Sequence, residues 1–417
     1  MHRNAPDLRG YAPGVAESYD VVVVGGGPAG LSAAQRLAAA GLRVVVLERG
    51  AAFGEPVRTS GGSFIAPLKR LGIPSRLWHP VTRLRLVGPG HDVTFRYRRA
   101  RMCVLDVRGL YQWLAARAAE SGAELRLKTH VTGVLIDEGV VAGVIARGVG
   151  ELQARLVVDA SGTTGTIARE VGLRGSAPRV GAGLEREVFA PRFDQREAYL
   201  IVGDDVAPGG YAWAFPRGDG RVRLGVGVVR PSSDADLAGL MDGLVDAVPA
   251  LGSCRDAQPL ETHSGVMSAF AHGAVPASAP GLLVVGDAAG HGSTLVGEGI
   301  RHAIVSGRLA GEVAAVALAA PGAADPTVLQ AFPRRWDALI GRQMRAGWRV
   351  HGRVSEYRDD DWERVIGAVA QMSPGVVMKA LAGELTPRFA ARLLLRHPLL
   401  ALREGRRFVI TALRDRS

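Results

Sequence analysis

Three glycines near the N-terminus have the spacing that brings a backbone turn against a pyrophosphate. They follow an apolar, β-branched run at residues 20–24 and precede a helical pattern at 31–40. Such a turn tightens the chain and presents the unpaired N–H groups of a helix N-terminus to phosphate oxygens. The residues expected to contact the ligand here are Gly25, Gly27, Pro28, Ala29 and Gly30. The segment therefore predicts a dinucleotide site.

An acidic residue stands where the second strand of the same unit would end. Residues 43–47 are apolar, and Glu48 follows them, eighteen positions after Gly30. A carboxylate at that place accepts hydrogen bonds from the ribose hydroxyls of an adenosine and repels a 2′-phosphate. FAD and NAD satisfy this pattern, whereas NADP does not. Arg49 comes next in the chain, and we expect it to lie over the adenine.

A second set of glycines decides between FAD and NAD. Residues 286–290 read Gly-Asp-Ala-Ala-Gly, and residues 297–300 read Gly-Glu-Gly-Ile. Both segments, and the stretch 159–162, resemble those of flavoproteins with a single Rossmann unit. The resemblance implies FAD, with Asp287 facing the ribityl chain and a helix N-terminus beneath the isoalloxazine. The further cofactor contacts that it implies are Arg108, Val131, Ala160, Gly286, Asp287, Gly297, Gly299 and Ile300.

Alternating aromatic residues narrow the resemblance. Residues 211–216 read Tyr-Ala-Trp-Ala-Phe-Pro, which is similar to the YxWxFP signature of the geranylgeranyl reductase family, and 218–228, 385–387 and 393–402 resemble the same family. That family saturates isoprenoid chains with reduced FAD, so the resemblance implies an apolar substrate. Alternate positions of a strand share one face, and the three aromatic side chains can line an apolar tunnel. An ordinary aromatic stripe in a core is the alternative. The expected substrate contacts are Tyr211, Trp213 and Phe215.

Two positions depart from the family pattern and are the candidates for catalysis. Many members carry a cysteine beside the flavin where this chain has Ser60, and a hydroxyl is a much weaker acid than a thiol. Proton delivery from that position must therefore be rearranged or absent. His291 precedes a segment in which the family often has Asn-Pro, and an imidazole near a flavin can act as acid or base around neutral pH. The alternative for His291 is a structural hydrogen bond within a loop.

The elements that must position these residues indicate an α/β protein. Residues 20–48 form a βαβ unit, and apolar strands at 155–160 and 282–285 return the chain to it. We expect a discontinuous, Rossmann-like FAD-binding domain, a substrate domain built on a mixed β-sheet, and a helical C-terminal region. The expected bounds are 1–18 for a flexible tail, 19–60, 101–175 and 277–325 for the FAD-binding domain, 61–100 and 176–276 for the substrate domain, and 326–417 for the helical region.

Charge argues against some partners and leaves others open. The net charge is +11, and residues 331–417 hold 17 Lys and Arg against 9 Asp and Glu. No nucleic-acid module accompanies this charge, and the aromatic residues do not alternate with the basic ones, so we expect no nucleic-acid partner. Anionic lipid, a diphosphate-bearing substrate, or simply a solvated basic surface fits the pattern. Residues 389–402 read either as an interfacial helix, which would add a peripheral membrane contact, or as a helix packed on the body.

Cysteine usage and hydropathy limit the cellular compartments in which the protein is expected. The two cysteines have no CxxC spacing and no pair of histidines has metal-ligand spacing, so we expect neither a disulfide framework nor a metal site. No apolar run is long enough to span a membrane. We therefore expect a cytoplasmic protein, which becomes membrane-associated if the interfacial helix forms.

Together these features predict an FAD-dependent oxidoreductase that reduces C=C bonds of a long isoprenoid or other apolar substrate. One alternative is an FAD-dependent monooxygenase or epoxidase acting on an apolar or polycyclic substrate. The other is a flavoprotein that relays electrons to quinone. A single Rossmann unit is visible in the sequence, so the electron donor, NAD(P)H or a redox protein, is expected to bind transiently.

Overall fold

A largely parallel sheet carries the glycine turn. The computed structural model describes residues 17–175 and 179–383, and in that part of the chain this sheet has eight strands in the order β17-β18-β11-β1-β2-β8, extended from β11 by β10 and β9. The strands from β18 to β8 run parallel. The eight strands are β1 (Glu17–Val24), β2 (Val44–Leu47), β8 (Glu124–Arg126), β9 (Val131–Asp137), β10 (Val140–Ala146), β11 (Gly150–Asp159), β17 (Ser278–Ala279) and β18 (Leu282–Val284).

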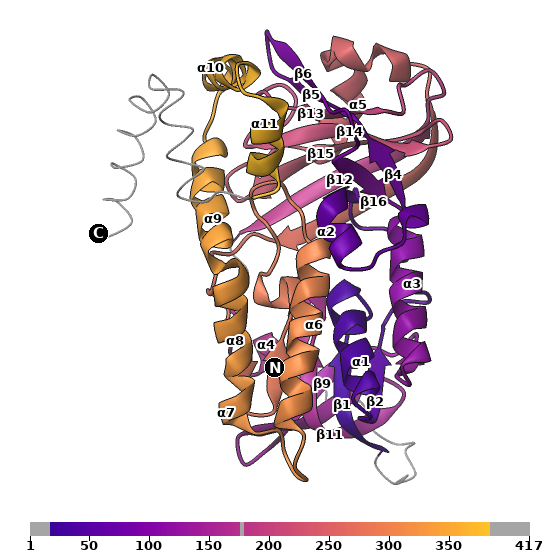
Figure 1. The fold of residues 1–417 in the computed structure, drawn as a ribbon, viewed down its shortest axis with the longest axis vertical. Helices are drawn as coiled ribbons and strands as arrows, with labels where there is room; N and C mark the ends of the chain where they lie inside the picture. The colour runs from indigo at the N-terminus through magenta and orange to yellow at the C-terminus, as the bar shows by residue number, and fades with distance from the viewer. Residues whose placement is uncertain (1–16, 176–178, 384–417) are drawn as a thin grey trace, which may run out of the picture.

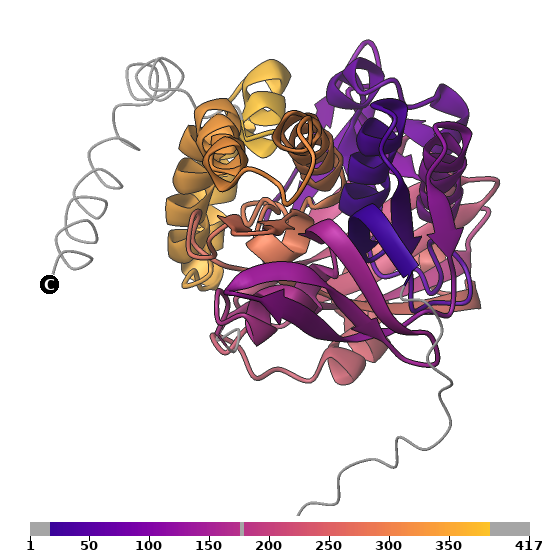
Figure 2. The ribbon, with the colours of Figure 1, turned by 90° about the horizontal axis from the view of Figure 1, so that it is seen from below.

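Three long helices lie side by side over one face of this sheet (Figure 1). They are α1 (Pro28–Ala39), α3 (Val107–Glu120) and α6 (Ile300–Ala317). Seen from below, the antiparallel strands β9 and β10, which extend from β11, lie on the other side of the sheet from α1 (Figure 2). Because both faces are covered, β1 and β2 are continuous β-branched and leucine runs in which every residue from 21 to 24 and from 44 to 47 is buried.

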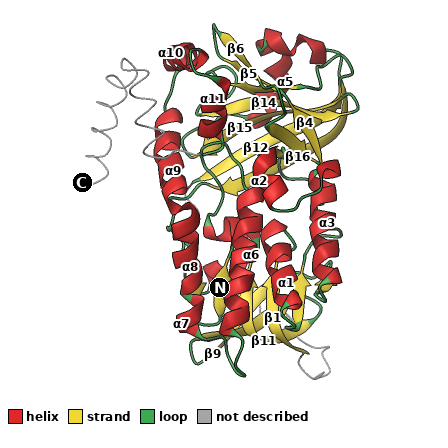
Figure 3. Cartoon of the chain, viewed as in Figure 1, coloured by secondary structure: helices red, strands yellow, loops and turns green. Residues whose placement is uncertain are grey.

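The second sheet fills the upper half of the molecule (Figure 3). Its order is β16-β12-β15-β14-β13-β5-β6, and β13 with β5 is its parallel pair. The outer face packs on α5 (Leu237–Ala247) through a core that includes Leu224, Val226, Met241 and Leu244. Its strands are β5 (Arg83–Val87), β6 (Asp92–Arg96), β12 (Val180–Phe189), β13 (Glu197–Ile201), β14 (Gly210–Gly218), β15 (Arg221–Arg230) and β16 (Gln258–Ser268). The inner face is therefore free to form a site.

A small third sheet joins the two larger ones and was not foreseen from the sequence. β7 (Met102–Leu105) pairs with both β3 (Gly62–Phe64) and β4 (Trp78–Val81), and α2 (Ile65–Arg70) follows β3. Strands expected in the substrate domain thus pair with a strand expected in the FAD-binding domain. The link keeps residues 59–64 in place between the two halves.

The C-terminal region is helical, as predicted, through the last described residue, 383. After α7 (Pro326–Leu329), the helices are α8 (Ala331–Trp336), α9 (Arg342–Val354), α10 (Asp359–Ala370) and α11 (Pro374–Leu381). The family-like segments at 385–387 and 393–402, the interfacial helix expected at 389–402 and most of the expected tail at 1–18 lie outside the described residues. None of the helices in the described ranges has the length and hydropathy to cross a lipid bilayer. The expectation of a mixed α/β fold with a parallel sheet, a second β-sheet and C-terminal helices is confirmed.

Candidate active site

The glycine turn between β1 and α1 is tightly packed on one side and open at its middle. A Cβ built on Gly25 would lie 2.4 Å from the carbonyl oxygen of Ala160, and one on Gly30 would lie 2.1 Å from that of Gly25. A Cβ on Gly27 would meet no atom within 4 Å. α1 begins at Pro28 without a side-chain cap, so no side chain occupies the N–H groups of its first turn. An anion is the ligand that such a helix N-terminus favours.

The carboxylate of Glu48 lies beside this turn, at the end of β2. The N–H of Gly26 donates to its Oε2 at 2.8 Å, and the N–H of Gly50 donates to its Oε1 at 2.7 Å. Both oxygens are therefore oriented by the backbone and keep lone pairs for ribose hydroxyls. The chain leading to the buried Val131 runs alongside, because the N–H of Thr129 donates to the carbonyl of Glu48 at 2.9 Å.

The two arginines expected near the cofactor lie at the surface of this region. Arg49 is exposed directly after Glu48. Arg108 is in the first turn of α3, and its guanidinium forms ion pairs with Glu55 at 2.8 Å and Glu261 at 3.6 Å. Arg108 would have to exchange one of these partners to bind a pyrophosphate, so its role stays a prediction.

Two helices place their N-termini at the same end of the molecule. A Cβ on Gly307 would lie 2.0 Å from the carbonyl oxygen of Ala29, and one on Gly311 would lie 2.9 Å from that of Ala33. Since both contacts advance by four residues, α1 and α6 run parallel and in step. α6 starts at Ile300, seven residues before its contact, whereas α1 starts one residue before its own. The N-terminus of α6 therefore extends about 9 Å beyond that of α1.

The second glycine segment lies between these helix ends. A Cβ on Gly286 would lie 2.9 Å from the Cβ of Ala29, which brings the segment against the glycine turn. The Oδ1 atom of Asp287 lies 3.7 Å from a Cβ built on Gly299, next to the start of α6. Desolvation raises the pKa of this carboxyl to about 6. Arg174 fixes the turn by donating from Nη1 to the carbonyl of Ala288 at 3.2 Å.

These features fit an extended dinucleotide such as FAD. Two helix N-termini without side-chain caps open toward one end of the molecule, with a carboxylate beside each. Glu48 would hold the adenosine ribose, the turn at Gly27 the pyrophosphate, and Asp287 the ribityl chain. The start of α6, at Gly299 and Ile300, would lie beneath the isoalloxazine, where a helix N-terminus favours negative charge on the ring.

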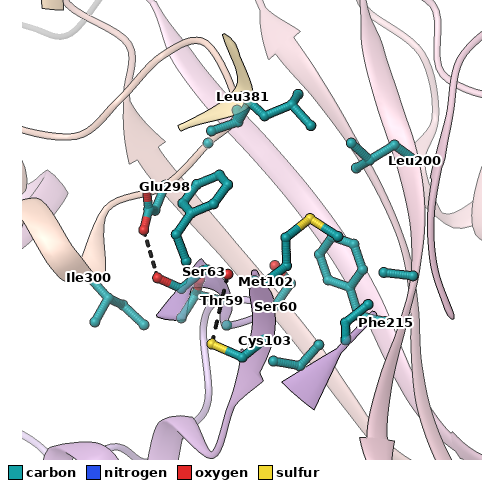
Figure 4. Close-up of a pocket in the computed structure, with 18 of the residues that line it drawn as sticks. Thr59, Ser60, Ser63, Met102, Cys103, Leu200, Phe215, Glu298, Ile300 and Leu381 are labelled. Carbon is teal, nitrogen blue, oxygen red and sulfur yellow. Dashed lines mark hydrogen bonds between the residues drawn. The ribbon is translucent and has the colours of Figure 1, made fainter. Parts of the chain in front are cut away.

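A largely apolar pocket begins at the start of α6 and continues along the inner face of the second sheet (Figure 4). Its polar end is formed by residues 59–63 and 297–299, and its apolar walls come from β4, β5, β7, β13, β14 and α11. Tyr211 and Phe215 line it, as does Ser60. The hydroxyl of Tyr211 donates to the carbonyl of Val296 at 2.8 Å, which ties the sheet to the loop before α6.

Trp213 lies behind the pocket wall and is not one of its lining residues. Its ring rests flat on the sheet over glycines: Cβ atoms built on Gly225, Gly227 and Gly183 would lie 2.3, 3.3 and 3.5 Å from it. The three aromatic side chains share one face, as expected, and the ring centroid of Trp213 is 6.2 Å from that of Phe215. Trp213 therefore supports the two rings that line the pocket, and its role as a direct substrate contact stays a prediction.

Several pocket residues were missed in the sequence because their neighbours come from distant segments. The hydroxyl of Ser63 donates to Glu298 at 2.7 Å, and Arg301 pairs with the same carboxylate at 2.7 Å. Cys103 puts a thiol in this pocket although position 60 has none, and burial raises the pKa of that thiol, which keeps it protonated. Only the Glu298-Arg301 pair, three residues apart at a predicted helix start, carried a local signal.

His291 lies outside the pocket, within the packing between η4 (Gly286–Ala289) and α8. Its Nδ1 is 2.7 Å from the hydroxyl of Ser306, and its ring centroid is 4.3 Å from that of Trp336. Burial lowers its pKa to about 3, so the ring stays neutral at physiological pH. This position favours the structural hydrogen bond that the sequence left open over a role as acid or base.

Comparisons with known proteins identify the family of this chain. A family model described as FAD dependent oxidoreductase matches residues 20–201, and one described as geranylgeranyl reductase catalytic domain matches residues 183–264. The digeranylgeranylglycerophospholipid reductase 2 of Methanothermobacter thermautotrophicus is 32% identical over 84% of this chain and 91% of its own. Reductase 1 of Methanopyrus kandleri is 34% identical over 76% of this chain and 86% of its own.

Solved structures point the same way. A geranylgeranyl bacteriochlorophyll reductase-like protein from Thermoplasma acidophilum superposes with a TM-score of 0.82 at 25% identity, over 94% of this chain and 100% of its own. The flavin-dependent brominase Bmp2, at 18% identity and a TM-score of 0.66 over 88% of this chain and 94% of its own, shares the fold. With such relatives along most of its length, this chain belongs to the geranylgeranyl reductase family of FAD-dependent oxidoreductases.

Proposed function

We propose that this enzyme reduces C=C bonds in the isoprenoid chain of a lipid. The observation that carries the proposal is the pocket, which begins at the expected isoalloxazine position and continues between apolar side chains. Relatives named digeranylgeranylglycerophospholipid reductases support a long isoprenoid chain as the substrate class.

The lining of the pocket supports a hydrocarbon chain over a compact polar substrate. The side chains away from α6 are apolar, among them Leu84, Met102, Leu200 and Leu381. Burial of each CH₂ group against such walls stabilises a complex by about 0.8 kcal/mol. Hydroxyl groups gather at the α6 end, where the lining includes Thr59, Ser60 and Ser63. A chain threaded between these walls would present its double bonds at the end where polar hydrogens are available.

The residues of the chain supply binding, orientation and a proton relay. FAD, when bound, supplies the hydride equivalent that an alkene reduction needs. Tyr211 and Phe215 hold the substrate against the sheet, and the apolar walls exclude water from the reacting carbon atoms. The hydroxyl of Ser60, which lines the pocket at its polar end, is proposed to relay a proton to the second carbon rather than to supply it as an acid, since a hydroxyl is a much weaker acid than a thiol. The electron donor, NAD(P)H or a redox protein, is proposed to bind transiently.

An anaerobic turnover experiment tests this function. The enzyme, reduced by light without dioxygen, is mixed with a geranylgeranyl-bearing glycerophospholipid, and flavin absorbance and the mass of the lipid are followed. We expect the flavin to reoxidise while the lipid gains two hydrogen atoms per event. A requirement for dioxygen, with one oxygen atom gained, would instead identify an oxygenase. Reoxidation by a quinone without any change in the lipid would identify an electron relay.

A matched pair of variants ties the activity to the pocket. Leu200→Trp places an indole within the apolar wall, on a strand that does not contact the glycine turn, and should abolish lipid turnover while FAD stays bound. Val316→Trp adds the same side chain at an exposed position of α6 and should leave turnover unchanged. Equal turnover in the two variants would contradict the assignment of the pocket.

A further inference from the structure

A buried cluster of charges lies on the inner face of the second sheet, behind the pocket. Glu185, Glu187, Arg223 and His263 each have no more than 5% of their surface exposed. Removing such groups from water costs several kcal/mol each unless they are paired and hydrogen-bonded. A sheet face that only had to be packed would be better served by apolar side chains, so these residues call for a specific role.

Strand register brings this cluster to the aromatic side chains of the pocket. His263, Glu185, Gly225 and Trp213 are directly opposite one another on β16, β12, β15 and β14. Glu187, Arg223 and Phe215 form the next such row. Residues opposite one another in adjacent antiparallel strands place their side chains on the same face. The charges and the aromatic rings are therefore neighbours within one continuous surface.

Glu185 is the junction of the two rows. Its Oε2 accepts a hydrogen bond from Nε1 of Trp213 at 2.7 Å, and its Oε1 is 3.0 Å from Nδ1 of His263. The Nε atom of Arg223 is 3.6 Å from the same Oε1. The glycines beneath Trp213 have no side chains that could restrain its ring laterally. The hydrogen bond to Glu185 therefore fixes the rotation of the indole within the plane of the sheet.

Arg223 carries the same cluster to the polar end of the pocket. Its Nη1 donates to the carbonyl of Ser60 at 2.7 Å, and its Nε donates to Glu187 at 3.0 Å. Gly61 packs on it as well, since a Cβ there would lie 3.1 Å from Nη1. The segment that presents the Ser60 hydroxyl is thus held by a guanidinium that the buried carboxylates orient.

We propose that Glu185 is a positioning residue of the substrate pocket, which fixes the indole of Trp213 directly and the backbone of Ser60 through Arg223. His263 is its cationic partner. Both ring nitrogens of His263 face carboxylates, Glu185 at 3.0 Å and Glu261 at 2.9 Å. A neutral imidazole has only one N–H, so this geometry requires the protonated ring.

The charges around His263 set the direction of its titration. Glu185 and Glu261 face it, Arg223 opposes it, and Arg108 lies one step further out on Glu261. The hydrogen bond to Glu185 is the largest cause of a raised pKa for His263. The proton is therefore held to a higher pH than in a free histidine and is lost as the pH rises through the raised pKa. Glu185 then loses one of its two cationic neighbours and keeps Arg223, and its hold on Trp213 changes.

The indole N–H of Trp213 reports this event without substrate or turnover. The protein has six tryptophans, and ¹⁵N-labelled indole gives one resonance for each, with the Trp213 signal identified by its loss in Trp213→Phe. We expect this resonance to shift as the pH rises through the raised pKa of His263, and to stop titrating in His263→Gln. Glu187→Gln is the matched control: Glu187 is equally buried on the same strand but bonds neither Trp213 nor His263, so the titration should persist there.

A second measurement, of turnover with the lipid substrate, links the cluster to the pocket and rests on the proposed function. The KM for the isoprenoid lipid should rise with the same midpoint in the wild type. Glu185→Gln should raise KM about tenfold while changing kcat less. In the Trp213→Phe background, Glu185→Gln should raise KM no further. A wild-type resonance that does not titrate, or one that still titrates in His263→Gln, overturns the pairing. A titrating resonance with a KM independent of pH overturns the positioning role while leaving the reductase assignment intact.

Discussion

The glycines beneath Trp213 give a graded test of how the pocket wall is built. Gly183, Gly225 and Gly227 all contact the indole, and none has a positive φ that an alanine would resist. A Cβ would lie 3.5 Å from the ring at Gly183, 3.3 Å at Gly227 and 2.3 Å at Gly225. The same glycine-to-alanine substitution therefore creates an ordinary contact with the indole at Gly183 and a severe overlap with it at Gly225.

The magnitudes follow from these distances. At Gly183 the new methyl fits. Because alanine reduces the conformational entropy of the unfolded chain, this substitution should stabilise the protein by about 0.4–1 kcal/mol. At Gly225 the indole must move, which costs about 1–3 kcal/mol in overpacking and weakens a hydrogen bond to a charged group that contributes about 1.5–3 kcal/mol. We expect Gly225→Ala to be less stable than the wild type by about 2–4 kcal/mol after the same unfolded-state gain is subtracted. Gly227→Ala should lie close to the wild type.

Thermal unfolding of the FAD-loaded protein measures the order of the three variants. We expect the Tm to be highest for Gly183→Ala, close to the wild type for Gly227→Ala and lowered by several degrees for Gly225→Ala. The displaced indole should also narrow the pocket, so Gly225→Ala should raise KM for the lipid while Gly183→Ala leaves it unchanged. Equal Tm values for Gly183→Ala and Gly225→Ala would refute the contact of Trp213 with the sheet.

Three further predictions address the cofactor, the buried histidines and the proton. Glu48→Ala removes an acceptor worth about 1.5–3 kcal/mol and should weaken FAD binding roughly ten- to a hundredfold, measured by flavin fluorescence titration. Burial lowers the pKa of His291 from 6.5 to about 3 and that of His302 to about 4. Between pH 6.5 and these values, the two rings take up protons only in the unfolded chain. Stability should therefore fall by about 1.4 kcal/mol per pH unit for each ring as the pH drops toward 4, and a Tm independent of pH would contradict this. Ser60→Cys should raise kcat for alkene reduction with KM unchanged, and an unchanged kcat would remove Ser60 from proton delivery.

The sequence was sufficient for the fold around the predicted nucleotide site because its signals are local. The turn at Gly25–Gly30 lies between a β-branched run and a helix, and Glu48 follows one strand later, all within about thirty residues. Each of these residues has its place in the fold fixed by a short segment of backbone. The parallel sheet followed from the same runs, because strands buried on both faces are apolar throughout.

The rest of the site could not be predicted, because it depends on pairing between distant strands. Ser60 meets Arg223 across 163 positions, and Ser63 meets Glu298 across 235. The small sheet formed by β3, β4 and β7 has strands of three or four residues, too short for alternation to be read. The YxWxFP pattern indicated the shared face of its aromatic rings but not that glycines on β12 and β15 would let Trp213 lie flat behind the lining.

The spacing of the two parallel helices connects the cofactor site to the pocket. Gly307 and Gly311 let α6 approach the backbone of α1 so closely that neither helix can slide along the other without a clash at Ala29 or Ala33. This contact fixes how far the start of α6 stands beyond the glycine turn, about 9 Å. The same helix start forms the polar end of the pocket, so backbone contact sets the interval between the glycine turn and the pocket. A change in that contact should therefore affect FAD binding and substrate turnover together, whereas a change at the sheet, such as Gly225→Ala, should raise KM for the lipid and leave FAD binding unchanged.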